Sequence, residues 1–573
     1  MTNKHRYLLG NHGYGLGSFS AVKGTLAVLS MGLLLVAACS TPSASAFPSS
    51  PSAKNVRPIA SPAPTLDAAI AQSTHLGPAG TDTQVSLSLG LKVRQQDKLA
   101  SVIAAGTTLT PAQYATQFGP DKVLVGRAVT ALRAAGLTAS WKNGSSLITA
   151  EGPAPAVATL LGIQIEDYRL PGGTTFYAST GEAHLPGAVA AVVSSVSGLD
   201  NYRQSHPFAV RPGGLTVTDV LAFYNIKPLR DAGLDGSGQT IVLPEIDDLP
   251  SLSDLNKFAA KYGLPPYDPL LTIKRDPSWG TPLKPQGETV LDLEIIHMIA
   301  PNAKMVIYLS AADFAHGERA FDQMVTDRLG SIISESLGAC ETETSSGHRS
   351  IYAQIQDRAV ALGMGHYVAS GDSGAFTCGE TKAPAGSFPS TLPTVTAVGG
   401  TSVFQAKDGG YYNEYAWGSP IDSTGTGGGA SGFFPLPDYQ KSVSSPDGHG
   451  FRQVPDVSAA ADPNTGFHII FGGKDGQAGG TSAAAPLWAA TVALINQDLQ
   501  RSGMRETGFA NPALYWMGEN AAKFPERPFH DVIAGNNLAY AAAPGWDMAT
   551  GWGSMDAAAM DRAWILYLKG GGA

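Results

Sequence analysis

A serine in a setting suited to nucleophilic attack lies late in the chain. Ser482 belongs to the run GGTSAAAP at residues 479–486, directly before a long helical pattern, PLWAATVALINQDLQ. The N-terminus of a helix offers free backbone N–H groups and the positive end of the helix dipole, and both favour developing negative charge. We therefore expect Ser482 to lie exposed at a helix N-terminus, although an ordinary N-cap serine produces the same local pattern.

A serine nucleophile needs a base, which in many hydrolases is a histidine. The chain has 12 histidines, but none has a suitable setting. His5 and His12 precede an apolar N-terminal run, and His75 and His184 precede the region around Ser482. His297 lies in an apolar helical pattern without an obvious partner. The sequence therefore argues against a Ser–His–Asp triad.

Carboxylates offer the alternative base. The run GETVLDLE opens an apolar helical pattern, in which Glu288 and Asp292 are four residues apart and share one helix face. Two carboxylates on such a helix predict a shared proton, whereas the plainer interpretation is a helix cap and a solvated side chain. Asp372, in GDSG, follows the apolar strand pattern GHYVAS, although Asp-Ser-Gly is also a common turn.

The N-terminus is typical of an exported protein. Basic residues flank an apolar run at 24–38 that is too short to span a bilayer comfortably. The run ends in VAAC, which resembles a bacterial lipobox, with Cys39 as the lipidated residue. Plain secretion after cleavage at Ala46 is the alternative. We expect an extracellular or membrane-anchored protein of the bacterial cell envelope, with a lipid anchor as the only membrane contact.

Composition divides the chain into four segments. Residues 1–39 form the export signal, and 40–75 are a Ser/Pro/Ala-rich tether. Alternating strand and helix patterns over 76–210 predict a compact α+β domain. Residues 211–573 contain near-continuous apolar runs typical of strands buried on both faces, so we expect an α/β domain with a mostly parallel sheet. A Pro/Gly-rich junction at 206–214 separates the two domains.

Charge and cysteine content exclude some functions. A net charge of −9, with 15% charged residues, argues against nucleic-acid binding. With Cys39 in the export signal, Cys340 and Cys378 remain. An exported pair is able to form a disulfide, and two free buried thiols are the alternative because sequence gives no geometry. Two cysteines without a neighbouring histidine cluster make a poor zinc site.

Seven phrases, in the same order, resemble the sedolisin (serine-carboxyl peptidase) family and its kumamolisin-like bacterial members. The similarity covers residues 80 to 568 and includes LTPAQYATQFG, GETVLDLE, ASGDSG, GGGASGFFPLPDYQ, VPDVSAAADPNTGF, GGTSAAAP and HDVIAGNN…APGWDMATGWG. The resemblance implies a subtilisin-like domain with a parallel sheet of about seven strands flanked by helices, preceded by a ferredoxin-like propeptide. It also implies a monomeric, autoactivating zymogen whose propeptide inhibits it until cleavage near 206–216.

The resemblance assigns roles that agree with the residue chemistry. Ser482 would attack the scissile carbonyl of a polypeptide substrate, and Glu288 would act as general base. Asp292 would orient Glu288, and a protonated Asp372 would donate a hydrogen bond to the oxyanion. A carboxylate base and a protonated donor predict an endopeptidase active in acid.

The resemblance also implies one structural Ca²⁺ ion near the C-terminus. Its ligands would be the side chains of Asp531 and Asp547 and the carbonyls of Val532, Ala543 and Gly545. Such hard oxygen atoms are the ligands that calcium prefers.

Two positions depart from relatives. Leu337 stands where some relatives have a tryptophan that links a glutamate, here Glu245, to the catalytic glutamate, so we expect a broken or rerouted proton network. Ser387 stands where some relatives carry an acidic specificity residue, so a preference for basic P1 residues is not expected.

The rival functions are a catalytically inactive cell-surface binding protein on a protease scaffold and a neutral subtilisin-like enzyme.

Overall fold

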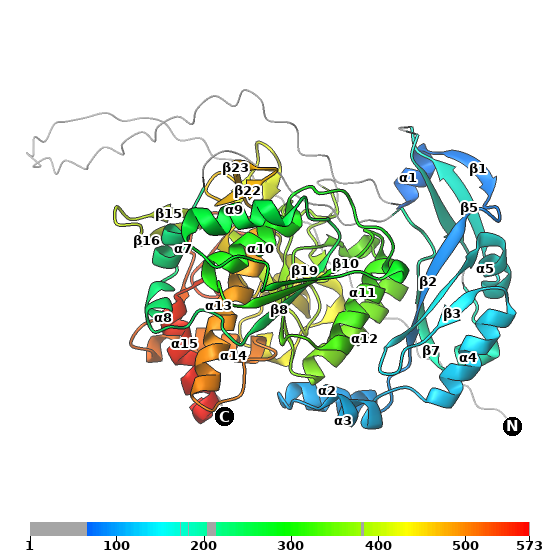
Figure 1. Cartoon of the computed structure of the whole chain (residues 1–573), viewed down its shortest axis with the longest axis horizontal. Coiled ribbons are helices and arrows are strands. Elements are labelled where there is room, and N and C mark those ends of the chain that lie inside the picture. Colours follow the sequence, from blue (N-terminus) through cyan, green and yellow to red (C-terminus); the bar gives the residue numbers. More distant parts are fainter. Residues whose placement is uncertain (1–65, 172, 182, 203–213, 380–382, 572–573) are drawn as a thin grey trace, which may run out of the picture. The chain divides into compact units, whose positions relative to one another are not determined.

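The computed structural model describes residues 66–571 except 172, 182, 203–213 and 380–382 (Figure 1). The expected export signal with Cys39 and nearly all of the junction at 206–214 lie outside the described residues. Within them, no helix is long and apolar enough to cross a bilayer.

A large sheet forms the centre of the C-terminal part, 214–571. In the described chain it has eight strands, seven of them parallel and β16 antiparallel at one edge. The strands are β9 (Leu271–Lys274), β10 (Lys304–Leu309), β8 (Thr240–Glu245), β11 (Ile332–Glu335), β13 (Gly365–Ala369), β15 (Thr396–Gln405), β21 (Val457–Ala460) and β16 (Tyr411–Ala416). The predicted, mostly parallel sheet of about seven strands is confirmed.

Helices cover both faces of this sheet, which explains why its strands lack polar alternation. On β8, Ile241 and Leu243 pack into one core and Val242 into the other, as the two-residue period of a strand requires. The first core includes α10 (Glu288–Ile299) and α13 (Thr481–Arg501), and the second includes α11 (Phe314–Asp327) and α12 (Ser346–Ala361) (Figure 1). The first face also carries α7 (Val217–Phe223), α8 (Lys227–Asp231), α9 (Leu252–Tyr262), α14 (Asn511–Glu519) and α15 (Ala557–Leu566).

The N-terminal part is the expected α+β unit. An antiparallel sheet has the order β3-β4-β2-β7, and α4 (Lys122–Ala134) and α5 (Ala154–Leu161) contribute to its core. Its strands are β2 (Gln84–Leu91), β3 (Thr138–Ser140), β4 (Leu147–Pro153) and β7 (Val193–Ser197). A second sheet, β1-β5-β6, comprises Thr74–Pro78, Gln164–Arg169 and Thr175–Thr180, and the remaining helices are α2 (Gln96–Ala104), α3 (Pro111–Gln117) and α6 (Gly187–Ala190).

The expected tether at 40–75 ends earlier than its composition indicates. A helix, α1 (Leu66–Gln72), lies within it, and Ala69 of this helix is buried in a cluster with Tyr168 and Phe176. The correction has a simple cause: Leu66, Ala69 and Ile70 suffice to dock a short helix on aromatic rings contributed by distant strands.

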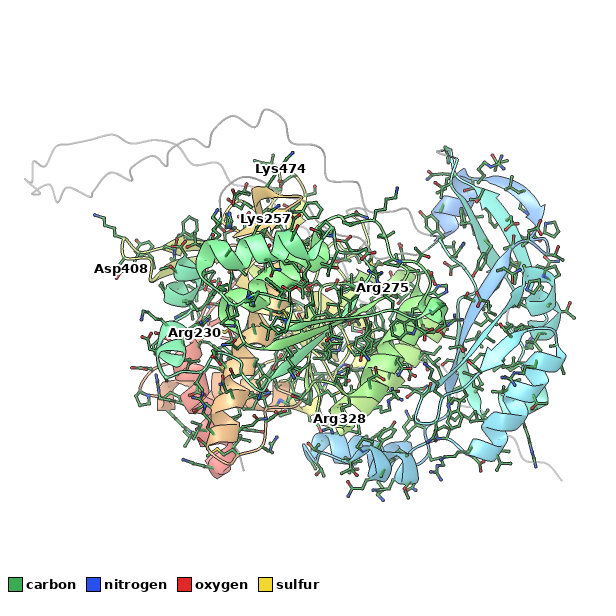
Figure 2. All side chains as sticks on the ribbon, in the orientation of Figure 1. Arg230, Lys257, Arg275, Arg328, Asp408 and Lys474 are labelled. Carbon is green, nitrogen blue, oxygen red and sulfur yellow. A yellow bond between two sulfur atoms is a disulfide. The ribbon has the colours of Figure 1, made fainter. Side chains whose placement is uncertain are left out.

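Helices α11 and α12 also contact the N-terminal sheet. Arg319 donates hydrogen bonds to the carbonyls of Leu87 and Ala150, at 3.1 and 3.2 Å, and Arg358 donates to the carbonyl of Gly144. By contrast, Lys257, Arg275 and Lys474 project from the surface of the C-terminal part (Figure 2). The two buried guanidinium groups therefore hold backbone carbonyls of the N-terminal part against the α11–α12 face.

Candidate active site

The start of α10 is fixed by an aspartate that sequence reasoning missed. Asp247, two residues after β8, accepts hydrogen bonds from the backbone N–H groups of Gln286, Gly287 and Glu288 at 2.7–2.9 Å. Gly287 has a φ of 114°, which favours glycine. A carboxylate at a helix N-terminus is favourable, and here it sets the direction in which α10 leaves the loop.

Three carboxyl groups meet beneath this helix start. Glu288 and Asp292 on α10 and Glu245 at the end of β8 are all at most 1% exposed. The carboxyl of Glu245 lies close enough to Asp292 to raise the pKa of Asp292, and Glu288 raises the pKa of both. Burial, followed by the neighbouring carboxylates, raises the pKa of Asp292 and of Glu245 well above the ordinary value.

A second residue missed by sequence reasoning joins this cluster to the serine. Ser336, directly after β11, has its hydroxyl 2.9 and 2.8 Å from the two carboxylate oxygens of Asp292 and 3.0 Å from the carbonyl oxygen of Ser482. The Ser482 hydroxyl in turn donates to the Ser336 carbonyl at 3.4 Å. The only sequence signal was a serine just past an apolar strand pattern. One residue thus links the α10 carboxylates to the start of α13.

Ser482 is the second residue of α13, so it lies at a helix N-terminus as expected. It is buried, however, with 1% of its surface exposed. Helix α13 runs through the first core and packs against α10 and β11, so its first turn is surrounded by protein. The expectation of an exposed serine was wrong because local sequence gives the helix terminus but not what covers it.

Asp372 lies in the loop after β13, beside the residue that precedes Ser482. Its Oδ1 accepts hydrogen bonds from the backbone N–H and the hydroxyl of Thr481, at 2.8 and 2.7 Å. Burial raises the pKa of Asp372 to about 6, against the lowering effect of the two Thr481 hydrogen bonds. At acid pH the group therefore carries a proton, and Oδ2 has no hydrogen bond to any described residue.

Histidine does not take part in this arrangement. No histidine in the described part of the chain forms a hydrogen bond with Ser482. The Nε2 of His297 lies 2.7 Å from the carbonyl oxygen of Pro265, and burial lowers its pKa to about 4. The half-buried His530 stacks on Tyr411. The preference for carboxylates over a histidine triad therefore agrees with the geometry.

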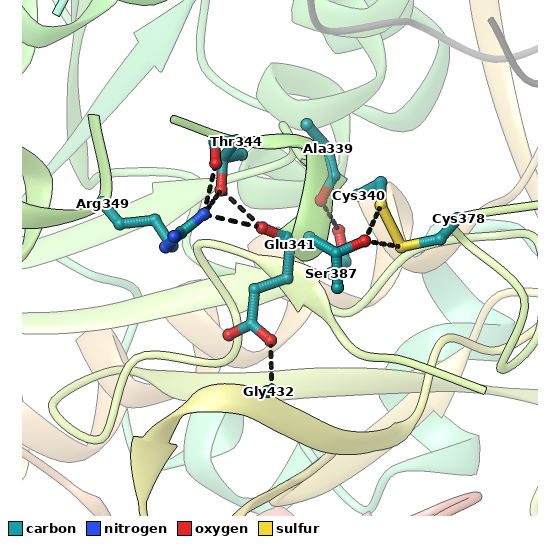
Figure 3. The surroundings of a disulfide bond; sticks show 9 residues. Ala339, Cys340, Glu341, Thr344, Arg349, Cys378, Ser387 and Gly432 are labelled. Atoms are coloured by element: carbon teal, nitrogen blue, oxygen red, sulfur yellow. Dashed lines mark hydrogen bonds between the residues drawn. A yellow bond between two sulfur atoms is a disulfide. The ribbon is translucent and has the colours of Figure 1, made fainter. Parts of the chain in front are cut away.

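A disulfide joins two segments of the chain that follow residues of the site. Cys340 and Cys378 are bonded (Figure 3), so the disulfide interpretation is correct and the free-thiol alternative is not. The bond connects the segment after Ser336 with the loop after Asp372. Nearby, β12 (Ala339–Cys340) pairs with β14 (Ser387–Phe388), and the Ser387 hydroxyl donates to the Ala339 carbonyl at 3.2 Å.

The expected calcium ligands come together around one loop. Asp531 accepts a hydrogen bond from the N–H of Gly545, and Asp547 accepts one from the N–H of Ala543, both at 2.9 Å. The described residues contain no group of three or more His, Cys, Asp and Glu side chains arranged for a metal. Since the expected site uses two carboxylates and three carbonyls, including that of Val532, its donor chemistry still fits a hard cation.

Comparison with known proteins gives consistent matches along the chain. The family model "Pro-kumamolisin, activation domain" matches residues 71–202, and that of the subtilase family matches 284–553. Kumamolisin from Bacillus sp. (strain MN-32) is 30% identical over 528 residues, which cover 84% of this chain and 92% of the relative. Sedolisin from Pseudomonas sp. (strain 101) is 30% identical over 557 residues, covering 89% and 90%.

A solved structure is also similar to this chain. Pseudomonas sedolisin, a serine-carboxyl proteinase complexed with two molecules of pseudo-iodotyrostatin, superposes with a TM-score of 0.55 at 29% identity. The match covers 63% of this chain and all of that chain.

Proposed function

Because the chain belongs to the sedolisin family of serine-carboxyl peptidases, we propose that it is an acid-acting endopeptidase whose nucleophile is Ser482. The observation that carries this proposal is the position of Ser336. Its hydroxyl lies within hydrogen-bonding distance of both the buried Asp292 carboxylate and the Ser482 carbonyl. Glu288, one turn before Asp292 on the same helix, is the general base.

The proposed reaction follows from these positions. The Ser482 hydroxyl attacks the scissile carbonyl while its proton passes to Glu288, and the tetrahedral oxyanion forms. Glu288 then returns the proton to the leaving amine, which departs and leaves an acyl-enzyme. Glu288 then takes a proton from a water molecule, which attacks the acyl carbon. The acyl group leaves as the free acid product, and Glu288 returns the proton to the Ser482 oxygen. Asp292 and Glu245, whose pKa values burial raises, lie beside Glu288 and so tune its basicity.

Asp372 is the proposed electrophilic partner of the oxyanion. Its Oδ1 is held by Thr481, so a proton on Oδ2 is free to point towards substrate. With a pKa of about 6, the group donates only in acid. The backbone N–H of Ser482, in the first turn of α13, supplies a second donor.

The N-terminal part is the proposed inhibitory propeptide. The match to an activation domain over 71–202 and the hydrogen bonds from Arg319 to the carbonyls of Leu87 and Ala150 support this assignment. We retain 76–210 as its proposed extent, 211–573 as the peptidase, and the junction near 206–216 as the cleavage region. Export with Cys39 lipidation in the bacterial envelope and a monomeric state are also proposals, from sequence alone.

We further propose one Ca²⁺ held by Asp531, Asp547 and the carbonyls of Val532, Ala543 and Gly545. When bound, the ion would supply structural cross-linking and neutralise two carboxylates. The convergence of both aspartates on the 543–545 loop supports this ligand set.

One experiment tests the peptidase. Purified full-length protein is incubated at about pH 4, where a carboxylate base near its ordinary pKa works, beside Ser482→Ala. Mass loss and peptide hydrolysis by the wild type alone are expected. Absence of processing in both proteins would favour an inactive scaffold, and activity confined to about pH 8 would rule out the carboxylate base.

A further inference from the structure

A cavity of about 50 Å³ is lined in part by Glu335 and Leu337, the two residues that flank Ser336 in sequence. Its walls include Ile246, Ala312, Phe314, Leu337 and Phe388, so most of its lining is apolar. On this scale one water needs about 10–15 Å³, so the cavity accepts the end of one long side chain rather than a larger ligand. No reaction step assigned above uses it.

The residues that line the cavity include a buried carboxylate, Glu318, one oxygen of which has no hydrogen-bond partner among the described residues. Glu318 on α11 is 0% exposed, and its Oε1 lies 2.6 Å from the Nδ1 of His348. Its Oε2 is buried and has no hydrogen-bond partner among the described residues. The ring of Phe314 stacks on His348 at 4.0 Å, which fixes the imidazole. An unpaired carboxylate oxygen in an apolar wall is costly, and a bound donor would remove that cost.

The charges around the cavity favour a cationic occupant. Two further carboxylates line it: Glu335, which pairs with His366 at 3.0 Å and accepts from Tyr352, and Asp313, which pairs with His316 at 2.7 Å. No lysine or arginine of the described chain lines it. A long side chain with an apolar stem and a positively charged end would contact the apolar lining residues with its stem and Glu318 with its charged end.

The position of the cavity connects it with an extended peptide in the active site. Leu337 and Gly338 lead from Ser336 into β12, which pairs on one side only, with β14, among the described residues. An edge of this kind can pair with an extended peptide, which would run alongside the segment that follows Ser336. Because an extended chain advances about 3.3 Å per residue, a substrate side chain roughly one to three residues from the reacting bond would reach the cavity.

We propose that this cavity is a substrate subsite that selects a lysine or arginine side chain through Glu318. The proposal rests on the peptidase function proposed above and adds a specificity to it. It differs from the Ser387 position, which carries no acid and whose hydroxyl is already engaged by the Ala339 carbonyl.

The test uses matched peptides and the processed enzyme. A fixed peptide is scanned at the positions flanking the scissile bond with lysine, its neutral isostere norleucine, tyrosine and phenylalanine, and kcat/KM is measured for each in acid. At one position lysine should exceed norleucine by about ten- to a hundred-fold, the range for a hydrogen bond between charged groups. Glu318→Gln should reduce this ratio to near one while the norleucine peptide is cleaved at an unchanged rate.

Two further variants keep the test decisive if Glu318→Gln folds poorly. Ala312→Leu narrows the cavity without touching Glu318 and should lower the lysine preference as well. Glu294→Gln removes another buried carboxylate, on α10, that does not line the cavity and should preserve the preference.

Equal cleavage of lysine and norleucine peptides at every position, or an unchanged preference in both cavity variants, would overturn the subsite. A preference for tyrosine over phenylalanine without one for lysine would overturn the cationic assignment. Loss of all hydrolysis by the wild type would instead contradict the peptidase function.

Discussion

The hydroxyl of Ser336 lies 2.9 and 2.8 Å from the two carboxylate oxygens of Asp292, although the residues are far apart in sequence. A hydroxyl has one proton, so it can serve only one acceptor at a time, and the Ser482 carbonyl competes for it at 3.0 Å. Ser336 therefore donates either to the Asp292 carboxylate or to the Ser482 carbonyl, and its place between the two makes it a positioning residue.

Substitution of Ser336 by alanine should reduce kcat roughly ten- to a hundred-fold, the effect of a lost hydrogen bond to a buried charged group. The pKa of Asp292 should rise further, because the Ser336 hydrogen bond lowers it, and the acid limb of the kcat profile should move to higher pH. Ser334→Ala is the matched control, since this buried hydroxyl on the preceding strand, β11, has no hydrogen-bond partner among the described residues. An unchanged pH profile for Ser336→Ala would contradict the positioning role.

Asp372 should set the alkaline limb of activity. Its pKa of about 6 means that the protonated donor is present below that pH and is lost above it. Asp372→Asn keeps a donor that does not titrate, so its kcat/KM should fall less steeply between about pH 5 and 7 than that of the wild type. Asp372→Ala should lose about 10²–10³ in kcat, the usual cost of an oxyanion donor. An equally steep limb in Asp372→Asn would assign the titration to another group.

Folding stability should decrease as the pH rises from acid to neutral. Burial raises the pKa of Asp372 to about 6 and that of Glu414 and Asp561 to about 7. The native state thus holds protons that the unfolded chain has released, so this stabilisation is complete below the unfolded pKa and is lost through the folded pKa. Denaturant unfolding of Ser482→Ala, which avoids self-digestion, should show this trend.

The Glu414 contribution can be isolated. Glu414→Gln, added to the Ser482→Ala background, should flatten the decline between about pH 4.5 and 7, because the amide does not ionise. The free energy of unfolding is compared at each pH, and the exposed Asp408→Asn serves as control. Stability that increases over this range in the parent would contradict the assigned direction.

Calcium should stabilise the folded protein through the 531–547 loops. At a concentration of about 100 times its dissociation constant, a bound ion adds about 2.7 kcal/mol to the free energy of unfolding. A chelator near neutral pH should therefore lower the melting temperature of the wild type, while Asp547→Asn should be less stable and insensitive to the chelator. Asp408→Asn should respond as the wild type does. A melting temperature that the chelator leaves unchanged would count against the site.

Loss of the Arg319 contacts should weaken propeptide inhibition. Arg319→Met removes two hydrogen bonds to carbonyls of the N-terminal part, so the zymogen should process itself faster at a given acid pH. Arg275→Met is the control, because Arg275 pairs with Asp248 in the C-terminal part. Processing is followed by mass at several times, and equal rates for all three proteins would show that Arg319 does not restrain activation.

The amino-acid sequence by itself determined the class of fold and indicated the types of catalytic group that we propose. Continuous apolar runs predicted strands covered on both faces, and the spacing of Glu288 and Asp292 predicted two carboxylates on one side of a helix. These features depend on local periodicity, which a chain displays without its tertiary contacts. The unsuitable settings of the histidines were also readable in this way.

Only the tertiary structure decided which groups touch. Ser336 and Asp247 come from loops after strand ends, and their partners lie 39 to 146 residues away, so no local pattern marks them. The burial of Ser482, the pairing of Cys340 with Cys378 and the unused oxygen of Glu318 likewise depend on packing between elements distant in sequence. Hydrogen bonds and desolvation act over a few ångströms in space, and chain order alone does not specify those distances.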